Sequence, residues 1–137
     1  MWLESRLSPF ILRIKMESKI NIPVALNDIS NHFSPQIIGE LNDVYIKIVK
    51  ILGEKVPWHN HKDEDELFYI LEGTLEMEIE NKPPFQMNKG DLYIVKRGVN
   101  HKVSSQNECH LMLIENKTTL HTGEVSTEIT KSIDEQK

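Results

Sequence analysis

Short runs of apolar and β-branched residues, separated by turn residues, recur along the chain from residue 44 onward. The clearest is residues 74–80, where Leu75, Met77 and Ile79 alternate with acidic residues, as in a half-buried strand with one wet face. Many short strands with frequent turns indicate an all-β barrel or sandwich. The runs that predict the other strands are residues 44–52, 66–71, 91–96 and 110–115.

Before residue 44 the apolar positions follow a helical period instead. Apolar side chains occur at positions 22, 26, 29 and 33, which would place them on one face of a helix. Pro23 suits the first turn, because proline lacks an N–H that this turn would leave unpaired anyway. We therefore expect a short helix within residues 23–33.

The charge and polarity of the two ends set the expected domain boundaries. Residues 1–22 carry four basic and two acidic side chains, and are predicted to be a partly ordered extension. Met16 begins a second plausible start of the chain, so residues 1–15 are expected to lie outside the essential fold. A single domain is predicted over residues 23–125, followed by a polar tail over 126–137 that frays.

Composition excludes several classes of function. The 137 residues include 16 basic and 21 acidic side chains, so the net charge of −5 lacks the basic field that binds nucleic acid. The longest apolar stretches are far shorter than the roughly 20 residues of a membrane span, and we find no signal peptide. The single cysteine, Cys109, excludes an intrachain disulfide and fits a reducing compartment. We expect a cytoplasmic protein with no nucleic-acid or membrane partner.

Three of the six histidines and one acidic residue form the candidate chemical site. His59 and His61 are one residue apart, so an extended chain points both imidazoles to the same side. Glu66 opens the next predicted strand, and His101 follows a predicted turn. If a barrel brings them together, three imidazoles and one carboxylate suit Zn²⁺, Fe²⁺, Mn²⁺, Ni²⁺ or Cu²⁺. An octahedral ion would keep two positions for water, substrate or dioxygen.

The spacing of these residues resembles the first sequence motif of the cupin superfamily. Its pattern is Gly, five residues, His-x-His, three or four residues, Glu, six residues, Gly, and the chain meets every spacing with Gly53, His59, His61, Glu66 and Gly73. The second motif is matched at its glycines and its histidine, by Gly90, Gly98 and His101. It is not matched at its proline and asparagine, where the chain has Lys96 and Ser105.

The resemblance covers residues 44–121 and implies more than a site. It implies a double-stranded β-helix, also called a jelly-roll barrel, with a metal held by the four residues named above, and a homodimer. Two segments, 63–73 and 120–125, are similar more narrowly to small single-domain cupins of the mannose-6-phosphate isomerase-like group. The function implied first is a metal-dependent enzyme of isomerase, epimerase or dioxygenase type, acting on a small oxygen-rich molecule.

Two alternatives to that enzyme stay open at this point. One is a metal-binding or small-ligand-binding module without turnover, and the other is an empty barrel that serves as a partner surface. The catalytic residues are unknown, although Glu66 is a possible proton shuttle as well as a ligand. Nothing in the sequence selects a general acid or base outside the four ligands.

The remaining candidates are interpreted mainly as structural. Cys109 is taken as structural, and His110 as a histidine of the barrel wall, with a proton relay as its functional alternative. His32 and His121 are expected at the surface. Phe68 shares the inward side of Glu66 by alternation, so it is expected in the core or the pocket wall.

Two charged segments near the candidate ligands are expected to be solvated. Residues 63–65 form an acidic run before Glu66, which usually marks a polar turn. Lys96 and Arg97 precede His101, and the functional alternative is that one of them pairs with an anionic substrate group.

Overall fold

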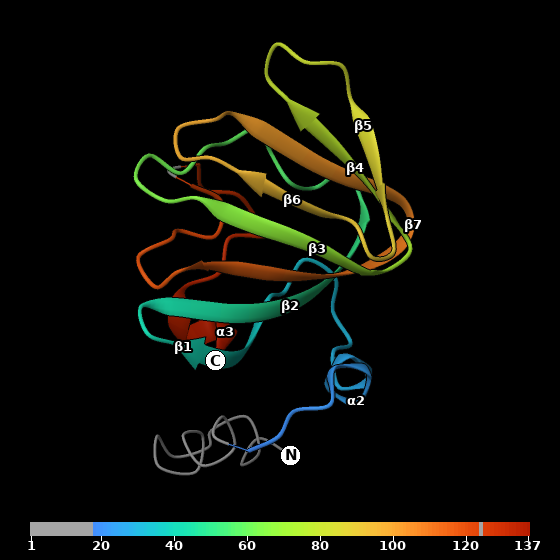
Figure 1. The fold of residues 1–137 in the computed structure, drawn as a ribbon, viewed down its shortest axis with the longest axis vertical. Coiled ribbons are helices and arrows are strands. Elements are labelled where there is room, and N and C mark those ends of the chain that lie inside the picture. Colours follow the sequence, from blue (N-terminus) through green and yellow to red (C-terminus); the bar gives the residue numbers. More distant parts are fainter. Residues whose placement is uncertain (1–17, 124) are drawn as a thin grey trace.

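Antiparallel strands make up most of the structure, a computed structural model that describes residues 18–137 except residue 124 (Figure 1). Among the described residues, no helix is both long and apolar enough to cross a bilayer. The elements are α2 (Ile22–Asn27), β1 (Gln36–Leu41), β2 (Val44–Gly53), β3 (Glu66–Glu72), β4 (Thr74–Ile79), β5 (Phe85–Asn88), β6 (Leu92–Val95), β7 (His101–Asn116) and α3 (Ile133–Gln136). The all-β prediction, with a short helix near the N-terminus, is confirmed.

Strand β7 joins two sheets into one barrel (Figure 1). Its second half pairs with β2 on one side and β3 on the other, in a sheet of order β1-β2-β7-β3-β6. Its first residues pair with β4, which in turn pairs with β5. All of these pairings are antiparallel. Because one strand runs through both sheets, residues from distant parts of the chain meet in the interior between them.

The alternation predicted for residues 74–80 is confirmed in β4. Leu75 and Met77 are fully buried and Ile79 is 4% exposed, whereas the glutamates between them are partly exposed. Burying such a side chain contributes roughly 1.5–3 kcal/mol relative to leaving it in water. The same inward face continues on β3 with Phe68 and Ile70, and these side chains form the main core.

Strands β1 and β5 and the first half of β7 were not predicted. The first half of β7 contains the run Ser104 to Glu108, which has no apolar alternation. This run extends a strand because β4 pairs with residues 101–104 and Gly53 of β2 pairs with Ser105. The short β5 is a strand for the same reason, as the partner of β4.

The predicted helix is present but shorter than expected. Helix α2 begins with the Asn21 side chain accepting a hydrogen bond from the Val24 N–H, and it ends at Asn27 rather than at residue 33. Beyond it, Phe33 takes a positive φ of 56° and enters the main core. The apolar face of the helix packs with Ile48 on the outside of the sheet.

The C-terminal segment packs against the barrel, and the prediction that it frays is wrong. Ile129 is 6% exposed and belongs to the main core. The Ser132 and Glu135 side chains cap α3 reciprocally, and the fully buried Gln136 accepts a hydrogen bond from the Nζ of Lys47 in β2. The segment folds back because a charge inside the barrel needs this partner. The predicted N-terminal extension lies outside the described residues up to residue 17.

Candidate metal centre

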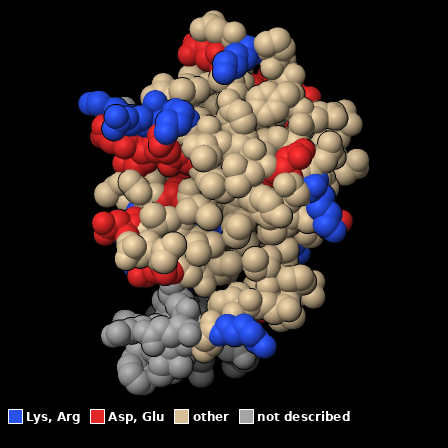
Figure 2. All heavy atoms as spheres, viewed as in Figure 1, with Lys and Arg blue, Asp and Glu red and all other residues tan. Residues whose placement is uncertain are grey.

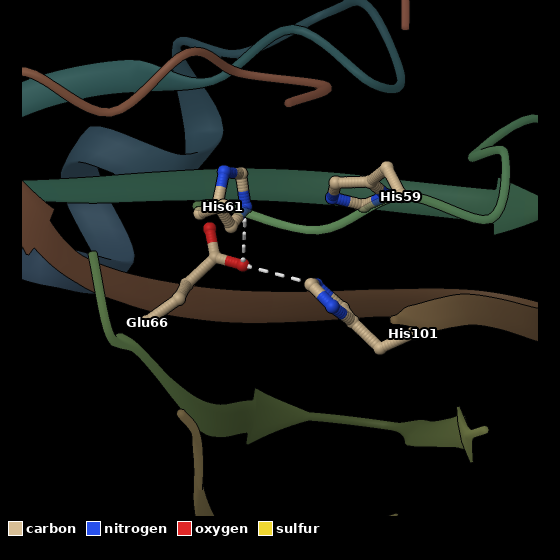
Figure 3. Close-up of side chains that lie close together, drawn as sticks. All are labelled: His59, His61, Glu66 and His101. Carbon is tan, nitrogen blue, oxygen red and sulfur yellow. Dashed lines mark ion pairs between the residues drawn. The ribbon is translucent and has the colours of Figure 1, made fainter. Parts of the chain in front are cut away.

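Four side chains from three separate segments converge inside the barrel (Figure 3). Each of them offers a ligand atom, and these atoms all lie within 4.8 Å of one another. His59 and His61 come from the connection between β2 and β3, Glu66 opens β3 and His101 opens β7. All four are at most 5% exposed. The structure therefore brings together the four residues that the sequence singled out, in a cluster that could bind a metal ion.

Backbone hydrogen bonds fix the histidine segment against β7. The N–H of His59 donates to the carbonyl of His101 at 3.0 Å, and the N–H of His101 donates back at 2.9 Å. The N–H of Gly98 donates to the carbonyl of His61 at 2.7 Å. The backbone that carries these imidazoles is therefore hydrogen-bonded to neighbouring segments. This pairing gives the cluster a defined geometry.

Two of the three imidazoles are oriented by carbonyl groups. The Nδ1 of His59 lies 2.8 Å from the carbonyl oxygen of Pro57, and the Nδ1 of His101 lies 2.9 Å from that of Val99. A carbonyl oxygen can only accept, so each Nδ1 carries the proton and each Nε2 is left as a lone-pair donor. This is the tautomer that a metal ligand needs, and such outer hydrogen bonds commonly orient histidine ligands.

Several polar atoms of the cluster are buried without hydrogen bonds. Both ring nitrogens of His61 and the Nε2 of His101 have no hydrogen-bond partner among the described residues. The nearest charged atom is Oε1 of Glu66, at 3.3 Å from Nε2 of His61 and 3.4 Å from Nε2 of His101 (Figure 3). Buried polar atoms rarely stay unpaired in proteins. Borderline nitrogen donors around one carboxylate oxygen are the donor set that a divalent transition metal would satisfy.

Burial and charge keep the cluster in a ligating state. Burial, with help from His101, lowers the pKa of His59 to about 4, so this imidazole is neutral at physiological pH. Burial alone would raise the pKa of Glu66. The neighbouring Glu115, His101 and His61 outweigh this and hold the pKa of Glu66 well below its usual value. Glu66 is therefore an anion inside the barrel.

A buried chain of charged side chains supports Glu66, and the sequence reading missed it. The Nζ of Lys47 lies 2.6 Å from Oε1 of Glu115, with both side chains at most 2% exposed. Glu115 lies beside Glu66, and burial followed by the charge of Glu66 raises the pKa of Glu115 well above its usual value. This direction favours the protonated form of Glu115 next to the anionic Glu66. The missed signal was alternation, which places Lys47 on the same face as the buried Val49 and Ile51.

His121, which we expected at the surface, is half-buried. It follows β7 in the loop that leads to α3, and its Nε2 is buried without a hydrogen-bond partner among the described residues. Burial, followed by the charge of Lys47, lowers its pKa to about 4. The charges of Glu66 and His61 also act on it. The residue is partly covered because the C-terminal segment packs beside its loop, where Thr122 hydrogen-bonds to Thr130.

The same loop packs directly against the two-histidine segment. Gly123 has a positive φ of 61°, and a Cβ at this position would lie 2.3 Å from the carbonyl oxygen of Asn60. Asn60 lies between His59 and His61, so the close approach is to the backbone that carries both imidazoles. Only glycine allows the loop and this backbone to come so near each other.

The other candidates lie outside the cluster, apart from Phe68. The Phe68 ring is 6.0 Å from that of His101, edge to face, as expected for an inward side chain. His110 and His32 both bond to the exposed Glu108, at 2.7 Å and 2.8 Å, which gives no support to a proton relay through His110. Burial raises the pKa of the Cys109 thiol to about 11, which fits a structural role.

Lys96, which was expected to be solvated, pairs with an acidic side chain of the same protein. The Nζ of Lys96 lies 2.7 Å from the exposed Asp65, which also accepts from the backbone N–H of Arg97. Asp65 thereby links the acidic turn to the turn before His101. This contact occupies Lys96 without any anionic ligand.

A separate hollow of about 610 Å³ opens between strand ends elsewhere on the barrel. It is lined mainly by polar side chains, among them Glu76, Gln86 and Ser104. None of the four clustered side chains lines it. Its walls also lack histidine and cysteine, so we base no chemistry on it.

Known proteins of the same fold resemble this chain over most of its length. The family model described as "Cupin domain" matches residues 51–115. A crystal structure of a cupin-2 domain containing protein from Shewanella frigidimarina NCIMB 400 is 37% identical, covers 72% of this chain and 94% of that one, and superposes with a TM-score of 0.69. YdbB from Bacillus subtilis (strain 168) is 28% identical over 102 residues, which are 74% of this chain and 89% of YdbB.

A more distant structure agrees on the architecture. A conserved protein with a double-stranded β-helix domain from Klebsiella pneumoniae is 18% identical, covers 73% of this chain and 90% of that one, and has a TM-score of 0.59. At this identity the likeness concerns the fold alone. The predicted double-stranded β-helix is therefore confirmed.

The contact between Gly123 and Asn60 predicts that even an alanine at position 123 destabilises the folded protein. Gly123→Ala should lower the free energy of unfolding by at least about 1 kcal/mol more than Gly90→Ala, measured by urea denaturation. Gly90 is the matched control, because it also has a positive φ, of 90°, but an added Cβ would meet nothing within 4 Å. The amide resonance of Asn60 should shift in the Gly123 variant alone. Equal costs for both variants would show that the contact is unimportant.

Burial of neutral histidines predicts that the metal-free protein loses stability in mild acid. Between about pH 4.5 and 6.5 the unfolded chain binds one more proton than the folded chain at each of His59 and His121, while the raised pKa of Glu115 acts in the opposite direction. The free energy of unfolding should therefore rise with pH over this window, by about 1.4 kcal/mol per pH unit for each net proton. Urea denaturation at several pH values measures the slope. His121→Phe should flatten it, and an unchanged slope in that variant would contradict the assignment.

Proposed function

The chain belongs to the cupin superfamily, and on this basis we propose that His59, His61, Glu66 and His101 bind one divalent transition metal ion. The observation that carries the proposal is the set of buried, unpaired ring nitrogens grouped around one oxygen of Glu66. Three imidazoles and one carboxylate suit Zn²⁺, Fe²⁺, Mn²⁺, Ni²⁺ or Cu²⁺. Cys109 is the only cysteine, and its protonated thiol offers none of these ions a ligand.

The protein is proposed to be a metal-dependent enzyme of isomerase or dioxygenase type that acts on a small oxygen-rich molecule. When bound, the metal would supply Lewis acidity toward a carbonyl or enolate oxygen, or redox chemistry with dioxygen if it is iron. Support for turnover comes from polar groups near the cluster that are not ligands: the buried Glu115 and Lys47, and the half-buried His121. A site that only stores metal has no need of such groups.

The chain's own residues supply a route for a proton. Glu115 holds a proton next to the anionic Glu66, while Lys47 stays paired to the other side of Glu115. If Glu66 loosened from the metal, it could take the proton of Glu115 and give it to a substrate, which would leave Glu115 as a carboxylate paired to Lys47. We propose Glu66 as the proton shuttle, with Glu115 as its reservoir and Lys47 as the positioning residue that holds Glu115.

Metal binding is tested by the composition of the purified protein. Purified without a metal-binding tag and reloaded, the wild type should hold about one Zn²⁺, Fe²⁺, Mn²⁺ or Ni²⁺ per chain, measured by elemental analysis. His61→Ala should weaken binding by 10-fold or more, since it removes one of four ligands. His110→Ala is the matched control, because His110 is partly buried but bonds to Glu108 away from the cluster. It should bind metal like the wild type.

The same preparations separate an enzyme from a binding module. Failure of the wild type to hold any of these ions would overturn the metal site and the enzyme together. If metal binds, oxygen uptake with small catechols, diketones and sugar acids identifies dioxygenation, and NMR of the same mixtures identifies isomerisation. Metal binding without turnover of any substrate in this set would favour the non-catalytic module.

The protein is also proposed to act as a cytoplasmic homodimer. Leu92 and Ile94 of the edge strand β6 are 54% and 45% exposed, and Figure 2 shows that the middle of this face carries few charged side chains. Free sheet edges with exposed apolar side chains tend to pair with another chain. The cytoplasmic location is supported by the single buried cysteine.

A substitution on β6 tests the dimer. Light scattering at micromolar concentration should give twice the chain mass of 15.9 kDa for the wild type. Ile94→Glu should give the monomer mass, because it would bury an unpaired charge in the interface. Glu76→Gln, on a different sheet, should remain dimeric. A monomeric wild type would contradict the proposal.

A further inference from the structure

The segment 120–125 stood out in the sequence, and the proposed metal site does not account for it. It contains His121 and Gly123, and Gly123 closely approaches the backbone of Asn60, between His59 and His61. His121, two residues earlier, feels the charges of His61 and Glu66 of the cluster. None of the backbone pairs that build the cluster includes it.

The imidazole of His121 is held in place with one nitrogen unused. A hydrogen bond to the backbone of Ile129 fixes the ring, and Ile129 is itself anchored in the main core. The Nε2 atom is buried and has no partner among the described residues. With a pKa lowered to about 4 by burial and by the charge of Lys47, the ring is neutral. A neutral ring that donates through one nitrogen keeps the other as an acceptor.

No described residue donates a hydrogen bond to the Nε2 of His121. The charges of Lys47, Glu66 and His61 all act on His121, so the ring lies within electrostatic range of the buried ion pair and of two candidate metal ligands. Lys47 bonds to Glu115 and Gln136, and it makes no hydrogen bond to the Nε2 of His121. Thr119, two residues earlier, is also buried with its hydroxyl unpaired. An unpaired buried acceptor is destabilising by about 1–3 kcal/mol unless something donates to it.

We propose that His121 is a ligand-binding residue of this site, whose Nε2 accepts a hydrogen bond from a hydroxyl group of a metal-bound small molecule. The inference rests on the proposed metal site. It deepens that proposal by naming the ligand class: a small anion with a hydroxyl next to the oxygen that reaches the metal, as in an α-hydroxy acid or an enediol. A molecule without this hydroxyl would leave Nε2 unpaired.

Two probes that differ only in this hydroxyl test the inference. Co²⁺-loaded protein is titrated with glycolate and with methoxyacetate, which replaces the hydroxyl hydrogen by a methyl group, and the cobalt absorption spectrum reports binding. The wild type should bind glycolate more tightly. In His121→Phe the dissociation constant for glycolate should rise about five- to tenfold, the worth of one hydrogen bond, while that for methoxyacetate changes less than twofold.

Control variants separate a binding role from a structural one. His121→Phe should keep the cobalt content of the wild type, and His121→Gln, whose side-chain oxygen can also accept, should recover part of the preference for glycolate. His110→Phe should behave like the wild type, because His110 bonds to Glu108 away from the site.

The possible outcomes distinguish this inference from the proposed function. Wild-type protein that binds no Co²⁺ would overturn the metal site and this inference with it. Normal Co²⁺ binding without a preference for glycolate, or an equal loss of both probes in His121→Phe, would overturn this inference alone. A fall in cobalt content in His121→Phe would also overturn it, because His121 would then hold the metal site rather than the ligand.

Discussion

A negative charge buried inside a barrel is the constraint around which this structure is built. Glu66 is an anion at 4% exposure, and an isolated buried carboxylate would be strongly destabilising. The fold compensates it with polar neighbours on several strands. His61 and His101 face one of its oxygens, and Glu115, whose raised pKa favours the neutral carboxyl, lies beside it. A divalent cation would complete this compensation, so the cluster serves stability and chemistry together.

The same constraint explains the C-terminal segment. Glu115 sits beside Glu66 with Lys47 on its other side, and the lysine in turn needs a neutral acceptor. Gln136 supplies it from a four-residue helix that has a capping box and little core of its own. The short helix therefore docks through one polar contact deep in the barrel. The chain leading to this helix also packs beside His121, whose ring hydrogen-bonds to the Ile129 backbone.

Local sequence patterns predicted most of the strands and the four candidate ligands. They failed for strands that form only because another strand pairs with them. The alternation in β4 and the spacing from Gly53 to Gly73 are properties of short segments, and they identify the inward side chains directly. The polar first half of β7 is a strand only because β4 and β2 pair with it. Lys47 was visible as a charge on a buried face, but its partner lies 68 positions away, at 115.

The sequence by itself determined that the chain forms an all-β cupin barrel, and which four side chains meet within it. Those features follow from side-chain periodicity and from motif spacing, which need only neighbouring residues. Tertiary structure alone decided the protonation states, the Lys47–Glu115–Glu66 chain, the contact of Gly123 with Asn60 and the burial of His121. These depend on desolvation and on distances between segments far apart in the chain. Such quantities arise only when the barrel closes and its C-terminal segment covers the site.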